Sequence, residues 1–327
     1  MQIQKIVTLI DKLDSKLAVL LCHHNADPDA IGAAFAFQGL LKRLKPELET
    51  EIVAASGPSR LSKSMMNFLP IQLTCQPRIE KADILFLLDT NTIQQLDEWS
   101  QRIRPDHHLI VIDHHASHPE TEGIATLSIT DETVSSTCEL VYHLFKEAKI
   151  KPSPEEAKAL FLGIAFDTRH FVIATSETLK VIAELTEAGV DSQKTLPILS
   201  MPMEHSERMA RLRAANRATI LKIKDWLIAF SNVSAYQASA ARGLLTLGAH
   251  VAVVTGKKGD KIQVSFRAVH EFYDKTAIHL GRDLAKPLGD FLGGMGGGHA
   301  VSAGANGAGA VDSCIKFCEK LLKKKLC

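Results

Sequence analysis

Short, unbroken apolar runs recur in the first 115 residues, and polar residues follow three of them directly. These runs end at Cys22, Leu88 and Ile112, and each is too short for a helix of ordinary length. Such runs are typical of strands buried on both faces of a parallel sheet. Segments with apolar residues at helical spacing lie between them. The pattern therefore predicts an α/β fold with a doubly wound, mostly parallel sheet.

The remainder of the chain alternates between helical and strand patterns and predicts a second, smaller α/β domain. A capping box at Ser153–Glu156 starts a helix that ends at Asp167, and residues 203–223 predict a long joining helix. Beyond it we expect strands at 226–230, 250–255 and 261–268, the last two joined by the turn Lys257-Lys258-Gly259-Asp260, and helices at 234–247, 277–292 and 311–326. The predicted domains are 1–190, a helical linker 191–224, and 225–327.

Composition restricts the class of protein and the compartment. The 327 residues are 46% hydrophobic and 23% charged, as in soluble globular proteins of two domains. There is no signal peptide and no apolar run of about 18 residues, so we expect a cytoplasmic protein without a membrane partner. No C-x-x-C pair occurs, which indicates free thiols in a reducing compartment. The six cysteines are Cys22, Cys75, Cys138, Cys314, Cys318 and Cys327.

The net charge of +1 hides an asymmetry between the two halves. Residues 1–221 carry 23 basic and 29 acidic side chains (net −6), which leaves 15 basic and 8 acidic side chains for residues 222–327 (net +7). An acidic half favours cations, and a basic half favours phosphate groups. The charge pattern thus separates a candidate metal-binding part from a candidate substrate-binding part.

Four clusters of His and Asp lie where predicted strands or helices end. They are His23-x-x-x-Asp27-x-Asp29, Asp89-Thr90, Asp113-His114-His115 and Asp167-Thr168. Because open α/β sheets bind ligands at the carboxyl ends of their strands, these clusters should meet at one site. A single buried His–Asp pair is usually only a hydrogen bond, but four such clusters favour a metal centre.

Six candidate metal ligands are too many for one catalytic ion that keeps positions open. They are His23, Asp27, Asp29, Asp89, His114 and Asp167. Two ions bridged by one carboxylate fit the count, and such pairs catalyse in-line displacement at phosphorus. Nitrogen and oxygen donors without thiolate favour Mn²⁺ or Mg²⁺, with Fe or Co²⁺ as alternatives, over a structural zinc.

A glycine-rich segment near the carboxyl end, Gly293-Gly294-Met295-Gly296-Gly297-Gly298-His299, is the second candidate site. Glycines leave backbone amides uncovered, so we expect a loop that cradles a phosphate before a helix. The alternative is a flexible linker.

The four clusters, taken in order with Gly296-Gly297-Gly298-His299, resemble the DHH phosphoesterase superfamily with its DHH-associated carboxyl-terminal domain. Within it the chain is similar to the two-domain branch of NrnA-type oligoribonucleases and pAp phosphatases. The resemblance implies two divalent ions, with Mn²⁺ preferred and Mg²⁺ or Co²⁺ as alternatives. Relatives often have Gly after the last cluster, whereas Arg169-His170 follows here.

The resemblance also implies residue roles. His23 and Asp27 would bind one ion, Asp29, His114 and Asp167 the other, and Asp89 both. His115 would lie near the scissile group, with Asp113 orienting the site. Arg267, Gly296, Gly297, Gly298 and His299 would hold the substrate phosphate.

The expected activity is hydrolysis of short RNA or DNA oligonucleotides and dinucleotides to nucleoside 5′-monophosphates. Four alternatives stay open: a pAp phosphatase, a hydrolase for linear products of cyclic dinucleotides, a RecJ-like single-strand exonuclease, and a nucleotide sensor without catalysis. A homodimer also stays open.

Overall fold

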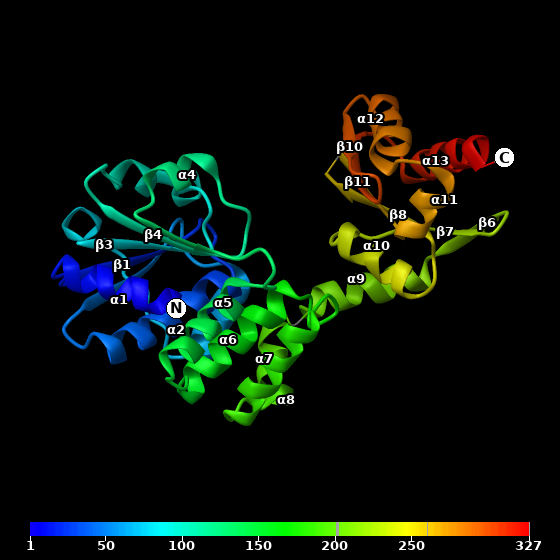
Figure 1. Cartoon of the computed structure of the whole chain (residues 1–327). Helices are drawn as coiled ribbons and strands as arrows, with labels where there is room; N and C mark the ends of the chain where they lie inside the picture. Colours follow the sequence, from blue (N-terminus) through cyan, green and yellow to red (C-terminus); the bar gives the residue numbers. More distant parts are fainter. Residues whose placement is uncertain (201–202, 260, 327) are drawn as a thin grey trace. The chain divides into compact units, whose positions relative to one another are not determined.

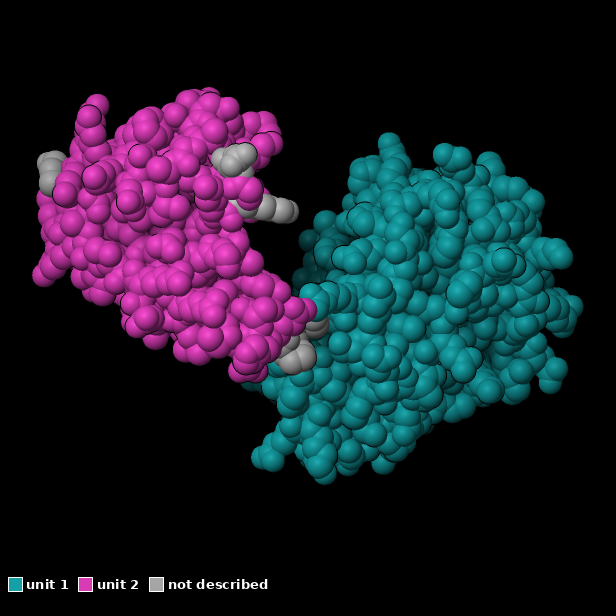
Figure 2. Space-filling view, turned by 180° about the vertical axis from the view of Figure 1, so that it is seen from behind, with its two compact units in different colours: residues 1–201 teal, residues 202–327 magenta. Residues whose placement is uncertain are grey.

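The computed structural model describes residues 1–200, 203–259 and 261–326. The chain divides into two compact units, residues 1–201 and 202–327 (Figure 2). Each unit has its own sheet. Asp260 of the expected turn and Cys327 lie outside the described residues.

The first unit is built on a parallel five-stranded sheet with the order β2-β1-β3-β4-β5. The strands are β1 (Leu17–Cys22), β2 (Glu49–Ala54), β3 (Ile84–Leu88), β4 (His108–Asp113) and β5 (Leu127–Thr130). Strands β1 and β3 are buried along their whole length, as the unbroken apolar runs predicted. The predicted α/β class with a parallel sheet is confirmed.

Helices cover the two faces of this sheet unequally. The helices of the unit are α1 (Gln2–Lys12), α2 (Pro28–Leu44), α3 (Arg60–Phe68), α4 (Pro119–Ile124), α5 (Thr137–Ala148), α6 (Pro154–Asp167), α7 (Ser176–Glu187) and α8 (Ser192–Thr195), with the 3₁₀ helices η1 (Ile79–Lys81), η2 (Ile93–Arg102) and η3 (Leu196–Leu199). Helices α2, α5 and α6 form the thick layer on one face (Figure 1). The other face is covered by η1, η2 and neighbouring loops.

Side chains along β1 alternate between these two layers. Ala18, Leu20 and Cys22 belong to the core under the helices, whereas Val19 and Leu21 belong to the core on the opposite face. Alternation is the consequence of the two-residue period of a strand. The strand order reverses direction between β1 and β3, which is the switch point where such sheets leave a crevice for ligands.

The second unit contains a six-stranded mixed sheet with the order β10-β11-β9-β8-β7-β6. Its strands are β6 (Thr219–Ile223), β7 (Trp226–Asn232), β8 (Val251–Lys258), β9 (Lys261–Ala268), β10 (Met295–Gly298) and β11 (Ser302–Ala308). Its helices are α9 (His205–Asn216), α10 (Gln237–Thr246), α11 (His270–Thr276), the π-helical turn η4 (Leu280–Ala285), α12 (Lys286–Phe291) and α13 (Val311–Leu326). Two apolar cores lie on the two faces of the sheet.

The expected long helix 203–223 was wrong in its second half. Helix α9 ends at Asn216, and Thr219–Ile223 form the edge strand β6, which pairs with β7. This part of the expected linker 191–224 therefore belongs to the second sheet. β-Branched side chains favour a strand there, and Lys224 takes a left-handed φ of 51° in the tight turn to β7.

The expected helix 277–292 was also only partly right. Helical structure begins at Leu280 as one π-helical turn and continues as α12, while α11 before it was not predicted. Among the described residues, no helix is long and apolar enough to cross a membrane.

A left-handed turn follows α6. Arg169, His170 and Phe171 have φ values of 51°, 57° and 70°, a run that only glycine adopts without strain. The turn is held by His170 N, which donates to Ala165 O at 2.7 Å. Phe171 packs edge-on against Phe161, with ring centroids 5.5 Å apart.

Candidate metal centre

The six candidate ligands all lie at element ends of the first unit. His23 follows β1, Asp27 and Asp29 begin α2, Asp89 follows β3, His114 follows β4, and Asp167 ends α6. Three parallel strands thus deliver polar residues to one edge of the sheet. In the sequence each of these strands is followed directly by its polar residues. Residues that are far apart along the chain therefore meet where the strands end.

His23, Asp27 and Asp89 form the first group. A ligand atom from each lies within 4.8 Å of the others. His23 Nε2 is 3.8 Å from Asp27 Oδ2 and 3.7 Å from Asp89 Oδ2. The other oxygen of Asp27 caps α2, because Oδ1 accepts from Asp29 N at 2.9 Å and Ala30 N at 3.1 Å. This cap leaves Oδ2 facing His23.

Asp29, His114 and Asp167 form the second group, again with a ligand atom from each within 4.8 Å of the others. His114 Nε2 lies 3.1 Å from Asp167 Oδ2 and 3.6 Å from Asp89 Oδ1. Asp29 is fully buried, and its carboxylate accepts hydrogen bonds from Thr137 N at 2.7 Å and Cys138 N at 2.9 Å. Asp89 lies between the two groups and is near a histidine of each.

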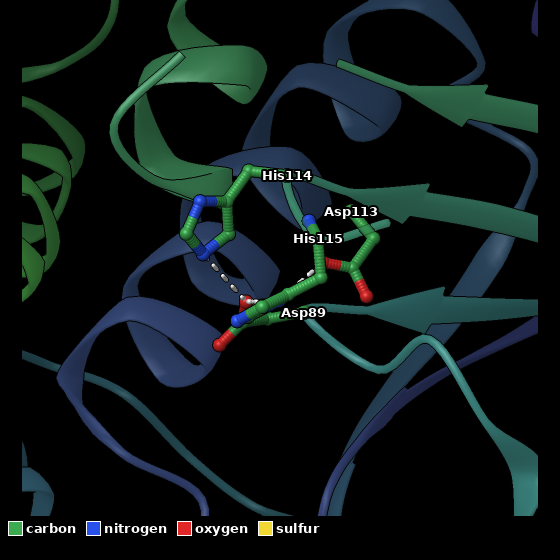
Figure 3. Close-up of side chains that lie close together, drawn as sticks. All are labelled: Asp89, Asp113, His114 and His115. Carbon is green, nitrogen blue, oxygen red and sulfur yellow. Dashed lines mark hydrogen bonds and ion pairs between the residues drawn. The ribbon is translucent and has the colours of Figure 1, made fainter. Parts of the chain in front are cut away.

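Asp113 holds His115 in place. Asp113 Oδ1 accepts from His115 N at 2.9 Å and is 2.8 Å from His115 Nδ1. The hydrogen bond to Asp113 raises the pKa of His115 to about 9, although partial burial opposes it. Figure 3 shows the ring of His114 pointing toward Asp89, with Asp113 at the end of β4 and His115 in the segment that follows. The side chain of His115 is 54% exposed, so it is open to a ligand.

Burial and mutual repulsion raise the pKa values of the clustered carboxylates. Burial raises the pKa of Asp29 and Asp89 well above the ordinary value, and neighbouring aspartates raise both further. Burial also raises the pKa of Asp27. Cations at this place would remove the repulsion and favour the ionised forms.

The donor set fits divalent ions. His114 Nε2 is buried and makes no hydrogen bond of good geometry within the described part of the chain, although Asp167 Oδ2 lies 3.1 Å away, so this nitrogen is free to bind an ion. Four carboxylates and two imidazoles, with no thiolate among the six, match ions that prefer oxygen and nitrogen. The two groups could therefore hold metal ions.

The candidate substrate residues lie in the second unit. Arg267 on β9 is half-buried, and its Nη1 donates to Phe266 O at 2.8 Å. Arg267 is in register with Ser302, whose carbonyl accepts from His299 N at 2.7 Å. Burial, and then the charge of Arg242, lower the pKa of Arg267. Arg267 and His299 thus lie at the same end of this sheet.

The glycine-rich segment is a strand, which corrects the expected loop before a helix. Met295–Gly298 form β10, which pairs with β11 in an antiparallel hairpin. Glycine is required because β10 packs closely on η4: a Cβ at Gly296 would collide with Ala285 O. At Gly297 a Cβ would meet nothing within 4 Å, so that backbone stays approachable. Gly298 has a φ of 135°, which favours glycine.

Sequence reasoning did not single out Thr137. Its hydroxyl donates to Asp89 Oδ1 at 3.0 Å, and its backbone N–H donates to Asp29. The Ser and Thr residues before an apolar helical face signal the start of α5, but not which residues that helix end contacts. These two hydrogen bonds join residues that are 48 and 108 positions apart in the sequence, so only the folded structure reveals them.

Comparisons with known proteins agree on one family. Residues 18–164 match the model of the DHH family, N-terminal domain. An uncharacterized protein of Methanocaldococcus jannaschii is 34% identical over 324 residues, which cover 97% of this chain and 94% of that protein. The bifunctional oligoribonuclease and PAP phosphatase NrnA of Bacillus subtilis is 26% identical over 302 residues, 88% of each chain.

The fold is also similar to a solved structure. An exopolyphosphatase-related protein from Bacteroides fragilis superimposes with a TM-score of 0.62 and 20% identity, covering 98% of this chain and 96% of that one. At this sequence identity the similarity concerns the fold alone, which consists of two α/β domains.

Proposed function

The chain belongs to the DHH family and is a phosphoesterase, and from this premise we propose that it hydrolyses short oligonucleotides and dinucleotides to nucleoside 5′-monophosphates with two bound Mn²⁺ ions. The observation that carries the proposal is the gathering of six His and Asp side chains into two groups of three, with Asp89 of the first group also 3.6 Å from His114 of the second. The similarity to the Bacillus subtilis oligoribonuclease supports the substrate class.

We assign the two groups to two ions. His23 and Asp27 would hold one ion, and Asp29, His114 and Asp167 the other, with Asp89 contributing to both. Divalent ions at these positions would supply Lewis-acid polarisation of a phosphate and lower the pKa of water. The absence of thiolate donors supports Mn²⁺ over a structural zinc.

The remaining residues of the site would orient and bind the phosphate. Asp113 fixes the ring of His115 through Nδ1, which leaves Nε2 for a hydrogen bond to a phosphate oxygen. In the second unit, Arg267, Gly296, Gly297, Gly298 and His299 would bind another phosphate of the substrate. The net charge of +7 over residues 222–327 supports a polyanionic substrate.

The proposed compartment is the cytoplasm. Cys22, Cys75, Cys138, Cys314 and Cys318 are free thiols, which supports a reducing environment.

A pAp phosphatase is the second candidate function. The Bacillus subtilis relative is named as both an oligoribonuclease and a PAP phosphatase, which favours this alternative over the others. Hydrolysis of linear products of cyclic dinucleotides would use the same two phosphate-binding regions. A RecJ-like exonuclease and a sensor without catalysis make different predictions about substrate length and turnover.

Substrate length provides the test. If a few nucleotides fill the candidate phosphate-binding residues, each further nucleotide would add charge without a further contact. We therefore expect kcat/KM for RNA of two to five nucleotides to exceed that for a 24-mer by at least about tenfold, equivalent to about 1.4 kcal/mol in transition-state binding. The assay measures release of nucleoside monophosphate with Mn²⁺ at fixed salt, since phosphate contacts depend on salt.

The alternatives give distinct results in the same assay. Equal efficiency on the 24-mer would indicate a RecJ-like exonuclease, and turnover of pAp without turnover of dinucleotides would indicate the phosphatase. Binding of every substrate without cleavage would indicate a sensor. Full activity in excess chelator would contradict the metal-dependent mechanism itself.

A further inference from the structure

The amino-terminal end of α5 touches the candidate metal centre at a point that no sequence motif marks. Ser136 caps the helix, and its hydroxyl accepts from Glu139 N at 3.0 Å. The next residue, Thr137, is fully buried and directed toward the carboxylates. It makes two hydrogen bonds to two different candidate ligands.

These two bonds have different chemical origins. The backbone N–H of Thr137 donates to Asp29 Oδ2 at 2.7 Å, a bond that any residue except proline would make. The side-chain hydroxyl donates to Asp89 Oδ1 at 3.0 Å, a bond that needs serine or threonine. Only the second bond depends on the identity of the side chain, so it is the one that mutation can isolate.

The hydroxyl bond fixes the rotation of the Asp89 carboxylate. With Oδ1 held by Thr137, Oδ2 is directed to His23 Nε2 at 3.7 Å, and Oδ1 also lies 3.6 Å from His114 Nε2. Asp89 itself has a left-handed φ of 53° after β3, and its backbone N–H donates to Ile112 O at 3.1 Å, which ties its backbone to β4. Rotation of this one carboxylate would turn its oxygens away from one group or the other.

We propose that Thr137 is a positioning residue for the candidate metal centre, holding Asp89 in the orientation that lets one carboxylate serve both groups. The inference rests on the proposed metal-dependent function. Outer hydrogen-bond partners of metal ligands orient them, and their loss commonly weakens metal affinity by about ten- to a hundredfold. The effect falls on the shared ligand and therefore on the affinity for one or both ions.

The test compares Thr137→Val, which keeps the shape but removes the hydroxyl, with Thr137→Ser, which keeps the hydroxyl. Titration of the full chain with MnCl₂ in a calorimeter gives the number of ions and their affinity. We expect two ions in the wild type and in Thr137→Ser, and an affinity of at least one ion reduced at least about tenfold in Thr137→Val. Thr255→Val is the matched control, because Thr255 is a buried threonine whose hydroxyl donates to Ser231 O in the second unit.

The possible results separate this inference from the proposed function. If the wild type binds two Mn²⁺ ions and Thr137→Val binds them equally well, Thr137 does not position Asp89. If Thr137→Ser loses affinity as much as Thr137→Val, packing and not the hydroxyl is responsible, and the inference is again wrong. If the wild type binds no Mn²⁺, the proposed metal centre itself fails. Should Thr137→Val not fold by circular dichroism, Thr137→Ala removes the hydroxyl without new volume and gives the same comparison.

Discussion

Some side chains at the site use one polar atom for a supporting hydrogen bond and keep the other available to a ligand. Asp27 uses Oδ1 to cap α2 and leaves Oδ2 toward His23. His23 uses Nδ1 on His24 O at 2.8 Å and leaves Nε2 toward the carboxylates. Each side chain is thereby held by one atom while the other faces the cluster, so the site is preorganised before any ligand binds.

The site makes the stability of the metal-free protein depend on pH. The folded-state pKa of His115, about 9, is above its ordinary value of 6.5, so the stabilisation is fully present below pH 6.5 and is lost as pH rises through 9. The raised pKa values of Asp29 and Asp89 also make the folded protein less stable as pH rises. Their effect begins at the ordinary pKa of an aspartate, which is lower than that of a histidine. We expect thermal denaturation in chelator to give a lower melting temperature at pH 9.5 than at pH 6.

His115→Gln isolates the histidine contribution to this slope. The variant should lose much of the decline between pH 6.5 and 9 and retain the part due to the carboxylates. An unchanged slope in the variant would show that the Asp113–His115 bond does not carry the effect. Because metal binding needs ionised carboxylates, Mn²⁺ should instead stabilise the protein more as pH rises.

At the scale of elements, the strand ends were predictable and their surroundings were not. Apolar runs ending in His or Asp fixed β1, β3 and β4, because a buried parallel strand allows polar residues only where it ends. Local composition misled at Gly296, where glycine permits the close packing of a strand and does not form a loop. Residues 219–223 form a strand where the sequence pattern predicts a helix, because helix propensity is a weak guide where a neighbouring strand is available.

The crossing of α2 and α6 depends on glycines that also determine the position of Asp29. A Cβ at Gly163 would collide with Cys138 Sγ and lie 2.8 Å from Asp29 Oδ1. We expect Gly163→Ala to lower the free energy of unfolding by about 1–3 kcal/mol through overpacking. It should also weaken Mn²⁺ binding, because Asp29 must move.

Chemical denaturation of the metal-free protein and calorimetric titration measure these two effects. Gly123→Ala is the control, since a Cβ there would meet nothing within 4 Å. It should be neutral or slightly stabilising. Equal stability of Gly163→Ala and wild type would mean that α2 and α6 can separate without cost.

At the scale of the whole molecule, the candidate metal ligands and the candidate phosphate-binding residues belong to separate units. All six ligands lie within residues 1–201, and Arg267 and His299 lie within 202–327. Each unit has its own sheet and core. The division of charge in the sequence predicts a cation-binding part and a phosphate-binding part, and the candidate residues of the two kinds lie in different units.

Substitutions in the two units should change different kinetic constants. Asp89→Ala should abolish turnover and reduce the number of Mn²⁺ ions bound, because both groups lose a ligand. Arg267→Ala should raise KM with a smaller change in kcat, since a phosphate contact stabilises ground and transition states alike. Lys275→Ala, which breaks only an exposed ion pair with Glu271, is the control for loss of positive charge in the second unit. Normal kcat in Asp89→Ala would contradict the two-ion assignment.

The left-handed turn at Arg169–Phe171 has a consequence for mutational robustness. Each L residue in this conformation costs about 1–2 kcal/mol, so three in succession cost about 3–6 kcal/mol. Net stabilities of single domains are about 5–15 kcal/mol. That net stability already includes such strain, so without the strained turn after Asp167 the first unit would have a larger margin to absorb harmful substitutions elsewhere. The first unit should accept fewer random substitutions before it unfolds than the same fold with glycine in that turn.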